Sequence, residues 1–230
     1  MKVSVIIPAA GQSRRMGLGT NKQFLTLKGK PVLAHTLAVF ENCLAVQEII
    51  IVAAEGEEEY CRREIIENHS FSKVSQVITG GKERQDSVYQ GILALSPDTE
   101  IVIVHDGARP FLTAELINRS IEHCLETGAA IVAVPVKDTI KIVNGEQTVE
   151  NTPPRHTLWA VQTPQTFRYS LLKEAHDRAK MQGFLGTDDA SLVERLGGQV
   201  KVVLGSYENL KITTPEDLII GGAILERGLG

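Results

Sequence analysis

The chain has 230 residues, of which 43% are hydrophobic and 23% are charged, and its formal net charge is -4. A chain of this size buries roughly 70–75% of the surface of its unfolded state, so its core needs no disulfide or metal staples. The slight excess of acids argues against broad binding to nucleic acid or to anionic membranes, which needs a clustered positive field. No apolar run approaches the roughly 20 residues that span a bilayer.

The cysteine content indicates a reducing compartment. Cys43, Cys61 and Cys124 are odd in number and widely spaced, which is typical of free and mostly buried thiols. A catalytic cysteine is an alternative that nothing around these residues favours. The first apolar run is short and leads into a Gly/Arg loop, not into a cleavage site, so we expect no signal peptide and a cytoplasmic location.

Apolar runs alternate with helix-like segments along the chain. Runs rich in β-branched residues predict strands at 3–7, 49–53, 74–78, 101–105, 129–134 and 200–203. Amphipathic segments predict helices after Pro31, from Thr214 onwards, and at 57–67, 85–95, 113–126, 170–182 and 188–196. Because the strand runs are nearly continuous, both faces of each strand should be buried. The pattern predicts an α/β fold with a mainly parallel twisted sheet flanked by helices.

Residues 136–162 break this alternation. Asn144-Gly145 lies between two short β-like runs, which predicts a hairpin, and Pro153-Pro154 excludes a helix there. We interpret the segment as a β-arm inserted into a single domain that spans residues 1–230. A projecting arm needs a partner for its apolar residues, so the arm predicts a homodimer.

Ligands of open α/β sheets bind beyond the carboxyl ends of the strands, so the loops that follow the strands are the candidate site. The first loop holds small residues at Ala9, Ala10 and Gly11, with Arg15 inside the loop and Lys22 just after it. Exposed N–H groups and two cations there predict an anion site. The loop matches neither of the two best-known phosphate-binding glycine motifs, and a solvated surface turn is the alternative.

Two further loops follow the third and fourth predicted strands. Gly80-Gly81, with Ser87 in the next helical turn, would let a base or sugar approach the backbone, although an ordinary turn explains these residues equally well. Asp106 and Gly107 follow the most apolar strand, where a carboxylate suits a ribose hydroxyl or a phosphate-bound Mg²⁺. An ion pair between Asp106 and Arg109 that only holds the loop is the alternative.

Lys211 lies between apolar residues in a segment that reads as a strand. Lysines are rarely buried without a partner, so either an anionic ligand or a neighbouring carboxylate should satisfy it. The run at 186–190 is either a site loop or a helix N-terminus capped by Thr187. No zinc, serine hydrolase or dithiol motif is present.

Seven motifs in register resemble one known family. They are PAAGQSRRMG…NKQF, GGKERQDSV, HDGARPF, AVPVKDTIK, LWAVQTPQTF, GTDDASLVE and NLKITTPEDL. Together they resemble the 2-C-methyl-D-erythritol 4-phosphate cytidylyltransferases of the non-mevalonate isoprenoid pathway. Ribitol-5-phosphate cytidylyltransferases share most of these motifs and are one alternative, and a non-catalytic nucleotide-binding protein is another.

The resemblance implies a Rossmann-like nucleotidyltransferase domain, CTP and 2-C-methyl-D-erythritol 4-phosphate as substrates, Mg²⁺ held mainly by the CTP phosphates, and a homodimer. It implies that Arg15 and Lys22 bind the triphosphate and stabilise the transition state. The cytidine would lie at Ala9, Ala10, Gly11, Gly81 and Ser87, with Asp106 and Gly107 near the ribose and the metal. The acceptor would meet Arg109, Thr163 and Lys211, and Thr139 and Arg155 from the partner subunit. The run Pro153-Pro154-Arg155-His156 before Trp159 departs from that of many relatives.

Overall fold

The computed structural model describes residues 1–11 and 22–228. Its centre is a seven-stranded sheet in the order β11-β7-β10-β6-β1-β4-β5. The strands are β1 (Lys2–Ala9), β4 (Glu48–Ala53), β5 (Val74–Thr79), β6 (Thr99–Val104), β7 (Ala129–Pro135), β10 (Trp159–Arg168) and β11 (Lys201–Leu204). All neighbouring pairs are parallel except those that β10 makes with β6 and β7.

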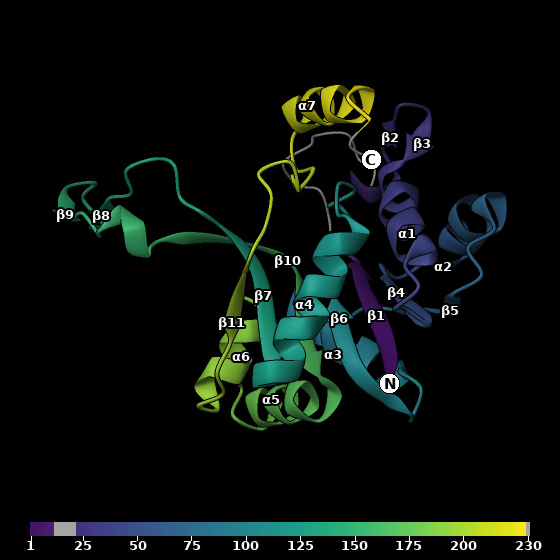
Figure 1. The fold of residues 1–230 in the computed structure, drawn as a ribbon, viewed down its shortest axis with the longest axis horizontal. Coiled ribbons are helices and arrows are strands. Elements are labelled where there is room, and N and C mark those ends of the chain that lie inside the picture. The colour runs from purple at the N-terminus through teal and green to yellow at the C-terminus, as the bar shows by residue number, and fades with distance from the viewer. Residues whose placement is uncertain (12–21, 229–230) are drawn as a thin grey trace.

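Helices cover both faces of this sheet (Figure 1). One face packs against α1 (Val32–Asn42), α4 (Ala114–Thr127) and the π-helical turn η2 (Cys61–Ile66). The other packs against α3 (Arg84–Ala94), α5 (Tyr169–Met181) and α6 (Asp189–Arg195). Alternate residues of β1 enter opposite clusters, Val5 and Ile7 one and Ile6 the other. Burial on both faces therefore explains the continuous apolar runs and confirms the predicted α/β class.

The remaining elements are short or peripheral. They are η1 (Lys22–Phe24), β2 (Thr26–Leu27), β3 (Lys30–Pro31), α2 (Glu58–Tyr60), η3 (Glu67–His69), β8 (Ile142–Val143), β9 (Val149–Asn151), η4 (Arg155–Thr157) and α7 (Pro215–Glu226). The helices predicted at 113–126 and from Thr214 onwards are α4 and α7, and the side chains of Thr113 and Thr214 cap them by accepting hydrogen bonds from backbone N–H groups in the first turn. No helix in the described part of the chain is long and apolar enough to cross a membrane.

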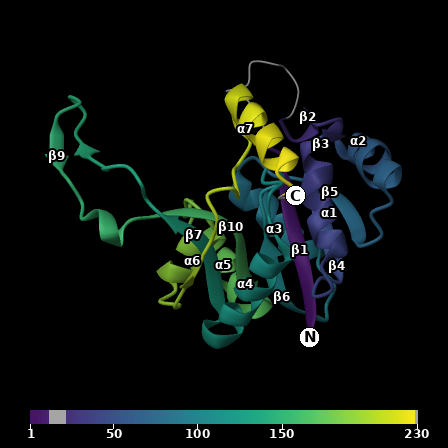
Figure 2. The same ribbon diagram turned by 45° about the horizontal axis from the view of Figure 1, so that its top comes forward.

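The arm is shorter than predicted. Trp159, Ala160 and Val161 pair with Pro135, Val134 and Ala133 of β7, so the last residues of the expected 136–162 segment begin the central strand β10. The sequence of β10 hid this strand because polar residues and Pro164 interrupt it, and the pairing with β7 is irregular between Val161 and Gln165. The hairpin itself is confirmed: β8 and β9 pair antiparallel and project from the body (Figures 1 and 2).

Lys211 does not lie in a strand, contrary to the sequence prediction. It belongs to the irregular segment between β11 and α7. The next residue, Ile212, donates its backbone N–H to the carbonyl of Ala108, 2.8 Å away, in the loop after β6. This bond joins the Lys211 segment to a loop and not to a strand, and it brings Lys211 to the carboxyl ends of the parallel strands.

Candidate active site

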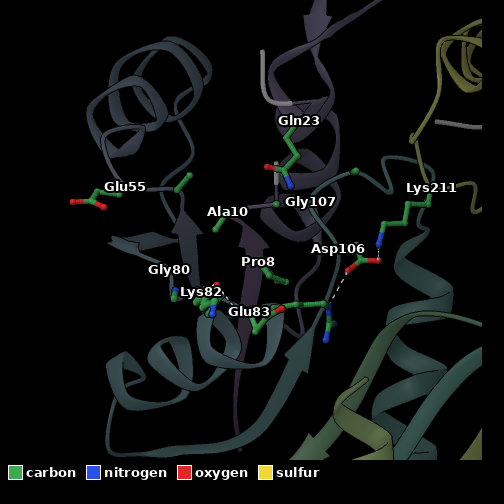
Figure 3. Close-up of a pocket in the computed structure, with 16 residues that line it drawn as sticks. Pro8, Ala10, Gln23, Glu55, Gly80, Lys82, Glu83, Asp106, Gly107 and Lys211 are labelled. Atoms are coloured by element: carbon green, nitrogen blue, oxygen red, sulfur yellow. Dashed lines mark hydrogen bonds and ion pairs between the residues drawn. The ribbon is translucent and has the colours of Figure 1, made fainter. Parts of the chain in front are cut away.

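A cavity of about 770 Å³ opens at the carboxyl ends of the parallel strands (Figure 3). Its walls come from the loops after β1, β4, β5 and β6, together with Gln23 and Lys211. The other described residues that line it are Pro8, Ala10, Gly11, Ala54, Glu55, Gly80, Gly81, Lys82, Glu83, Arg84, Ser87, Asp106, Gly107 and Ala108. The cavity lies where a doubly wound sheet is expected to bind ligands.

The loop between β5 and α3 packs tightly against the end of β1. Gly81 donates its N–H to the Ser87 hydroxyl, 3.1 Å away, and that hydroxyl donates to the carbonyl of Glu83, 3.2 Å away. A Cβ on Gly80 would lie 2.7 Å from the Ser87 Oγ and 2.8 Å from the Cβ of Ala10. Only glycine fits at this distance, so the backbone of the loop itself forms the wall of the cavity.

Replacing Gly81 by alanine tests this close packing. An added Cβ would overlap the Cβ of Asp86, so the loop must shift. Overpacking of this kind costs ~1–3 kcal/mol, and we expect the KM for CTP, the nucleotide that the sequence resemblance implies, to rise roughly tenfold or more. The control is Gly145→Ala at the tip of the arm, where an added Cβ meets nothing within 4 Å. Steady-state kinetics that show equal KM values for the two variants would contradict a nucleotide site at this loop.

Three cationic side chains converge on Asp106. Lys211 Nζ lies 2.8 Å from Asp106 Oδ2, Arg109 Nε 3.5 Å from the same oxygen, and Arg84 Nε 3.5 Å from Oδ1. Figure 3 shows Lys211 and Asp106 in the wall of the cavity, with their side chains pointing toward each other. The sequence left open whether a carboxylate or an anionic ligand satisfies Lys211. A carboxylate does, and it gathers three cations beside the cavity, of which Arg84 has a second carboxylate partner in Asp189.

The cations determine the ionisation of Asp106. Burial alone would raise its pKa, but the charges of Lys211, Arg84 and Arg109 outweigh burial and hold the pKa well below the usual range of a carboxyl group. Asp106 is therefore a carboxylate at every physiological pH. It can orient the three cations toward an anionic ligand without itself taking a proton.

A second set of buried groups holds the loop after β6, on the side of Asp106 away from the cavity. Thr163 Oγ1 accepts the backbone N–H of Asp106 at 3.0 Å and lies 3.1 Å from His105 Nδ1. Arg109 Nη1 donates to the carbonyl of Asn209 at 2.7 Å. Burial lowers the pKa of His105 to about 4, so its ring is neutral at pH 7. The neutral ring holds the loop through Thr163 and the carbonyl of Arg109.

The predicted site residues fall into distinct groups. Seven line the cavity together: Ala10, Gly11, Gly81, Ser87, Asp106, Gly107 and Lys211. Arg109 and Thr163 support Asp106 from behind, and Ala9 is buried at the end of β1. Thr139 and Arg155 are exposed on the arm, where Arg155 donates to the carbonyl of Lys137. Arg15 and the side chain of Lys22 lie outside the described residues.

Sequence reasoning missed Arg84 as a site residue, although the motif GGKERQDSV contains it. Arg84 lines the cavity and joins Asp106 to the buried Asp189. The sequence allows two interpretations of the run at 186–190, a site loop or a helix N-terminus capped by Thr187. The cap of α6 is Asp188, whose carboxylate accepts the N–H of Ser191, and Asp189 points inward to Arg84. The two adjacent acids, Asp188 and Asp189, were the feature of the sequence that could have indicated this buried contact.

Comparison with known proteins decides the family. A family model described as 2-C-methyl-D-erythritol 4-phosphate cytidylyltransferase matches residues 3–227. This chain belongs to that family. The protein of that name from Alkaliphilus metalliredigens is 57% identical over 226 residues, covering 98% of this chain and 94% of the relative. That from Geotalea uraniireducens is 52% identical, covering 98% of this chain and 97% of the relative.

Solved structures agree with the sequence match. A crystal structure of 4-diphosphocytidyl-2C-methyl-D-erythritol synthase from Anaerococcus prevotii superimposes with a TM-score of 0.87 at 34% identity, covering 98% of this chain and 96% of that one. A 2-C-methyl-D-erythritol 4-phosphate cytidylyltransferase from Thermus thermophilus superimposes with a TM-score of 0.82 at 36% identity, covering 98% and 100%. The predicted family, fold class and enzyme class are confirmed. The chain is a cytidylyltransferase that makes 4-diphosphocytidyl-2-C-methyl-D-erythritol in the non-mevalonate isoprenoid pathway.

Proposed function

We propose that both substrates of the cytidylyltransferase meet in the cavity at the strand ends. The cytidine lies against the end of β1 and the Gly80–Ser87 loop, where closely packed glycines leave backbone groups in the wall. The acceptor 2-C-methyl-D-erythritol 4-phosphate lies beside Lys211 and its partner Asp106, with Arg109 and Thr163 behind them, and Asp106 and Gly107 also border the ribose and the metal. The convergence of three cations on Asp106 is the observation that supports this division most strongly.

In the proposed mechanism, an oxygen of the acceptor phosphate attacks the α-phosphorus of CTP. The new P–O bond forms as the bond from the α-phosphorus to the bridging oxygen breaks, and pyrophosphate leaves with that oxygen. The acceptor phosphate is already ionised at neutral pH because its second pKa is about 6, so no general base is needed. No histidine or cysteine occurs among the described residues of the cavity wall. The protein supplies positioning and positive charge, through Lys211 and Arg84 and, we propose, Arg15 and Lys22.

The family implies a divalent cation, and the cavity offers a donor of suitable chemistry. Among the described residues, no group of three or more His, Cys, Asp or Glu side chains could hold a metal by itself. Asp106 contributes a hard carboxylate oxygen to the cavity wall, which is the donor type that Mg²⁺ prefers. We propose that Mg²⁺ is held mainly by the CTP phosphates, with Asp106 as the protein donor, and that it neutralises charge on those phosphates.

We further propose a single domain whose arm completes the site of a second copy. The arm exposes apolar side chains that the body of its own chain leaves uncovered: Ile140, Ile142, Val143 and Val149. The neighbouring strands add Trp159, Val161, Val202 and Leu204, which are also exposed. Apolar residues in this number on a projecting hairpin favour a homodimer. Thr139 and Arg155 on the arm would then reach the acceptor bound to the partner subunit.

Mixing two inactive variants tests this arrangement. Lys211→Ala disables the cavity of its own subunit, whereas Arg155→Ala disables the cavity of the partner subunit. Equal amounts of both, exchanged into mixed dimers, should recover roughly a quarter of wild-type activity, because one site in each heterodimer is complete. Pyrophosphate release measures the recovery, and light scattering measures the dimer. No recovery, or an active monomer, would contradict action in trans.

The cysteines favour a reducing compartment, and we propose the cytoplasm. Cys43, Cys61 and Cys124 are free and buried. Burial raises the pKa of Cys61 and of Cys124 to about 12, so neither is a thiolate at neutral pH. Buried thiols of this kind pack as small apolar side chains and take no part in the proposed chemistry.

A further inference from the structure

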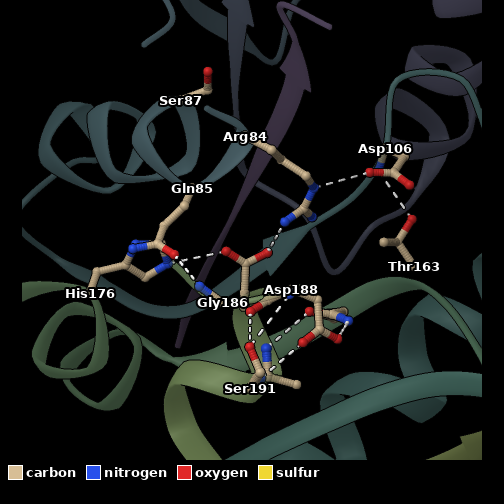
Figure 4. Close-up of polar contacts among 12 residues, drawn as sticks. Arg84, Gln85, Ser87, Asp106, Thr163, His176, Gly186, Asp188 and Ser191 are labelled. Atoms are coloured by element: carbon tan, nitrogen blue, oxygen red, sulfur yellow. Dashed lines mark hydrogen bonds and ion pairs between the residues drawn. The ribbon is translucent and has the colours of Figure 1, made fainter. Parts of the chain in front are cut away.

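Behind the cavity, the acidic side chain of Asp189 holds Arg84, and His176 in turn contacts Asp189. Asp189, the first residue of α6, is 1% exposed, and its Oδ2 lies 2.7 Å from Arg84 Nη1. The other oxygen, Oδ1, lies 3.1 Å from Nε2 of His176 on α5, which is also 1% exposed (Figure 4). Burial alone would raise the pKa of Asp189, but Arg84 and His176 outweigh it and lower the pKa, so Asp189 is ionised.

Arg84 connects the buried Asp189 to Asp106 in the cavity wall. Its guanidinium is a rigid planar fork, so fixing Nη1 on Asp189 also fixes the direction of Nε. Nε lies 3.5 Å from Asp106 Oδ1, whereas Lys211 and Arg109 share Oδ2. The two oxygens of Asp106 therefore have separate partners. Arg84 orients the carboxylate from one side, and the ammonium of Lys211 lies on the other.

We infer that Asp189 and His176 are positioning residues for cytidylyl transfer, which act through Arg84 on Asp106 and Lys211. This inference rests on the proposed site, in which Asp106 and Lys211 face the acceptor. Neither Asp189 nor His176 lines the cavity. They affect the reaction by placing Arg84 and Asp106, which do line the cavity.

The fold does not need Asp189 for the helix that begins there. Asp188 already caps α6 through a capping box with Ser191, and the Gln165 amide donates to Asp188 Oδ2 at 2.7 Å and accepts the N–H of Ala190 at 3.2 Å. A buried ion pair is commonly no more stabilising than apolar side chains of the same volume. Orientation of Arg84 accounts for a buried carboxylate here better than the stability of α6 does.

The surroundings of His176 fix the orientation of its ring relative to Asp189. Its ring stacks on Tyr89 at 6.1 Å with an interplanar angle of 11°. Nε2 contacts Asp189, and Nδ1 has no hydrogen-bond partner among the described residues. The stacked ring therefore presents Nε2 to Asp189 Oδ1, which leaves Oδ2 free for Arg84. The distribution of partners over the two oxygens of Asp189 repeats that over Asp106.

A double-mutant cycle tests the inference. Asp189→Asn, Arg84→Gln and the double variant are compared with wild type by kcat/KM for both substrates, and thermal unfolding reports folding. We expect each single change to lower kcat/KM by roughly tenfold to 100-fold, the effect of misplacing a group by about 1 Å. The double variant should be no slower than Arg84→Gln alone, because Asp189 acts through Arg84. Losses that multiply in the double variant, or full activity of Asp189→Asn, overturn the inference.

A milder variant and two controls complete the test. His176→Asn keeps the pair of Asp189 and Arg84, so it should cost a few-fold in kcat/KM, and nothing more in the Arg84→Gln background. A loss that persists in that background overturns the role of His176. Glu174→Gln removes another acid of α5, which pairs with Arg178 at the surface, and should retain wild-type kcat/KM. If Lys211→Ala is inactive and the cycle is additive, the site stands and only the positioning role fails. If Lys211→Ala is fully active, the site itself fails.

Discussion

Replacing Lys211 by alanine is expected to lower kcat for cytidylyl transfer by roughly 10²–10³, the usual cost of losing one preorganised charge-stabilising group. Lys211 lines the cavity, and its ammonium lies 2.8 Å from Asp106. The substrates bring a triphosphate and a phosphate together, so negative charge must be neutralised where the new bond forms. Steady-state pyrophosphate release at saturating CTP measures the loss.

Lys173 provides a matched control. Its side chain is 36% exposed, as is that of Lys211, and it pairs with Asp177 at 2.6 Å, on α5 away from the cavity. Lys173→Ala should leave kcat within about twofold of wild type, as is usual for a surface substitution away from the site. Equal activity of the two variants would show that Lys211 only balances the charge of Asp106. A loss in kcat confined to Lys211→Ala supports its contact with the reacting phosphates.

Asp106→Asn is expected to damage both stability and catalysis. The variant leaves Lys211, Arg84 and Arg109 without their shared carboxylate. We expect the free energy of unfolding to fall by about 2–3 kcal/mol. This is less than the 3–5 kcal/mol of a fully buried broken pair, because Lys211 and Arg84 are about one-third exposed and water screens them. We also expect kcat to fall by roughly 10² or more, since the cations lose their orientation.

The difference in the free energy of unfolding between wild type and Asp106→Asn should increase as the pH rises from acid to neutral. The pKa of Asp106 is lower in the folded state than the unfolded value of about 3.9. Its contribution is therefore fully present above about pH 4 and is lost as the pH falls toward the folded pKa. Denaturant unfolding should show the largest gap between wild type and Asp106→Asn at neutral pH, and a narrower gap below about pH 4. A gap that does not change with pH would contradict the ionised, cation-paired state of Asp106.

The parallel strands could be predicted from the sequence because a strand that is buried on both faces is apolar at nearly every position. Ile49–Ala53 and Ile101–Val104 are continuous apolar runs, and the structure buries every one of these residues. The loops after such strands meet at one edge of the sheet, so Gly81, Asp106 and Gly107 could be assigned to one site before any coordinates. The register of β10 could not be predicted. Its buried Gln162, Thr163, Gln165 and Thr166 make side-chain hydrogen bonds that no periodicity reports.

The polar interior of the site also escaped prediction. Asp188 and Asp189 look alike in the sequence, and both suit the first turn of a helix. Only the tertiary structure separates them: Asp188 caps α6, and Asp189 enters the interior to meet Arg84 of α3 and His176 of α5. Lys211 was recognised as unusual from its apolar neighbours, but its partner is 105 residues away. Long-range pairs of this kind depend on the topology of the whole sheet.

A crystal structure of the protein with its product, 4-diphosphocytidyl-2-C-methyl-D-erythritol, tests the central claim most directly. We predict the cytidine against Gly80, Gly81 and Ser87. The phosphate that came from the acceptor should lie within hydrogen-bonding distance of Lys211 Nζ, with Asp106 still ion-paired to Arg84. A product whose cytidine lies away from the Gly80–Ser87 loop, or whose phosphates do not meet Lys211, would contradict this assignment of the cavity.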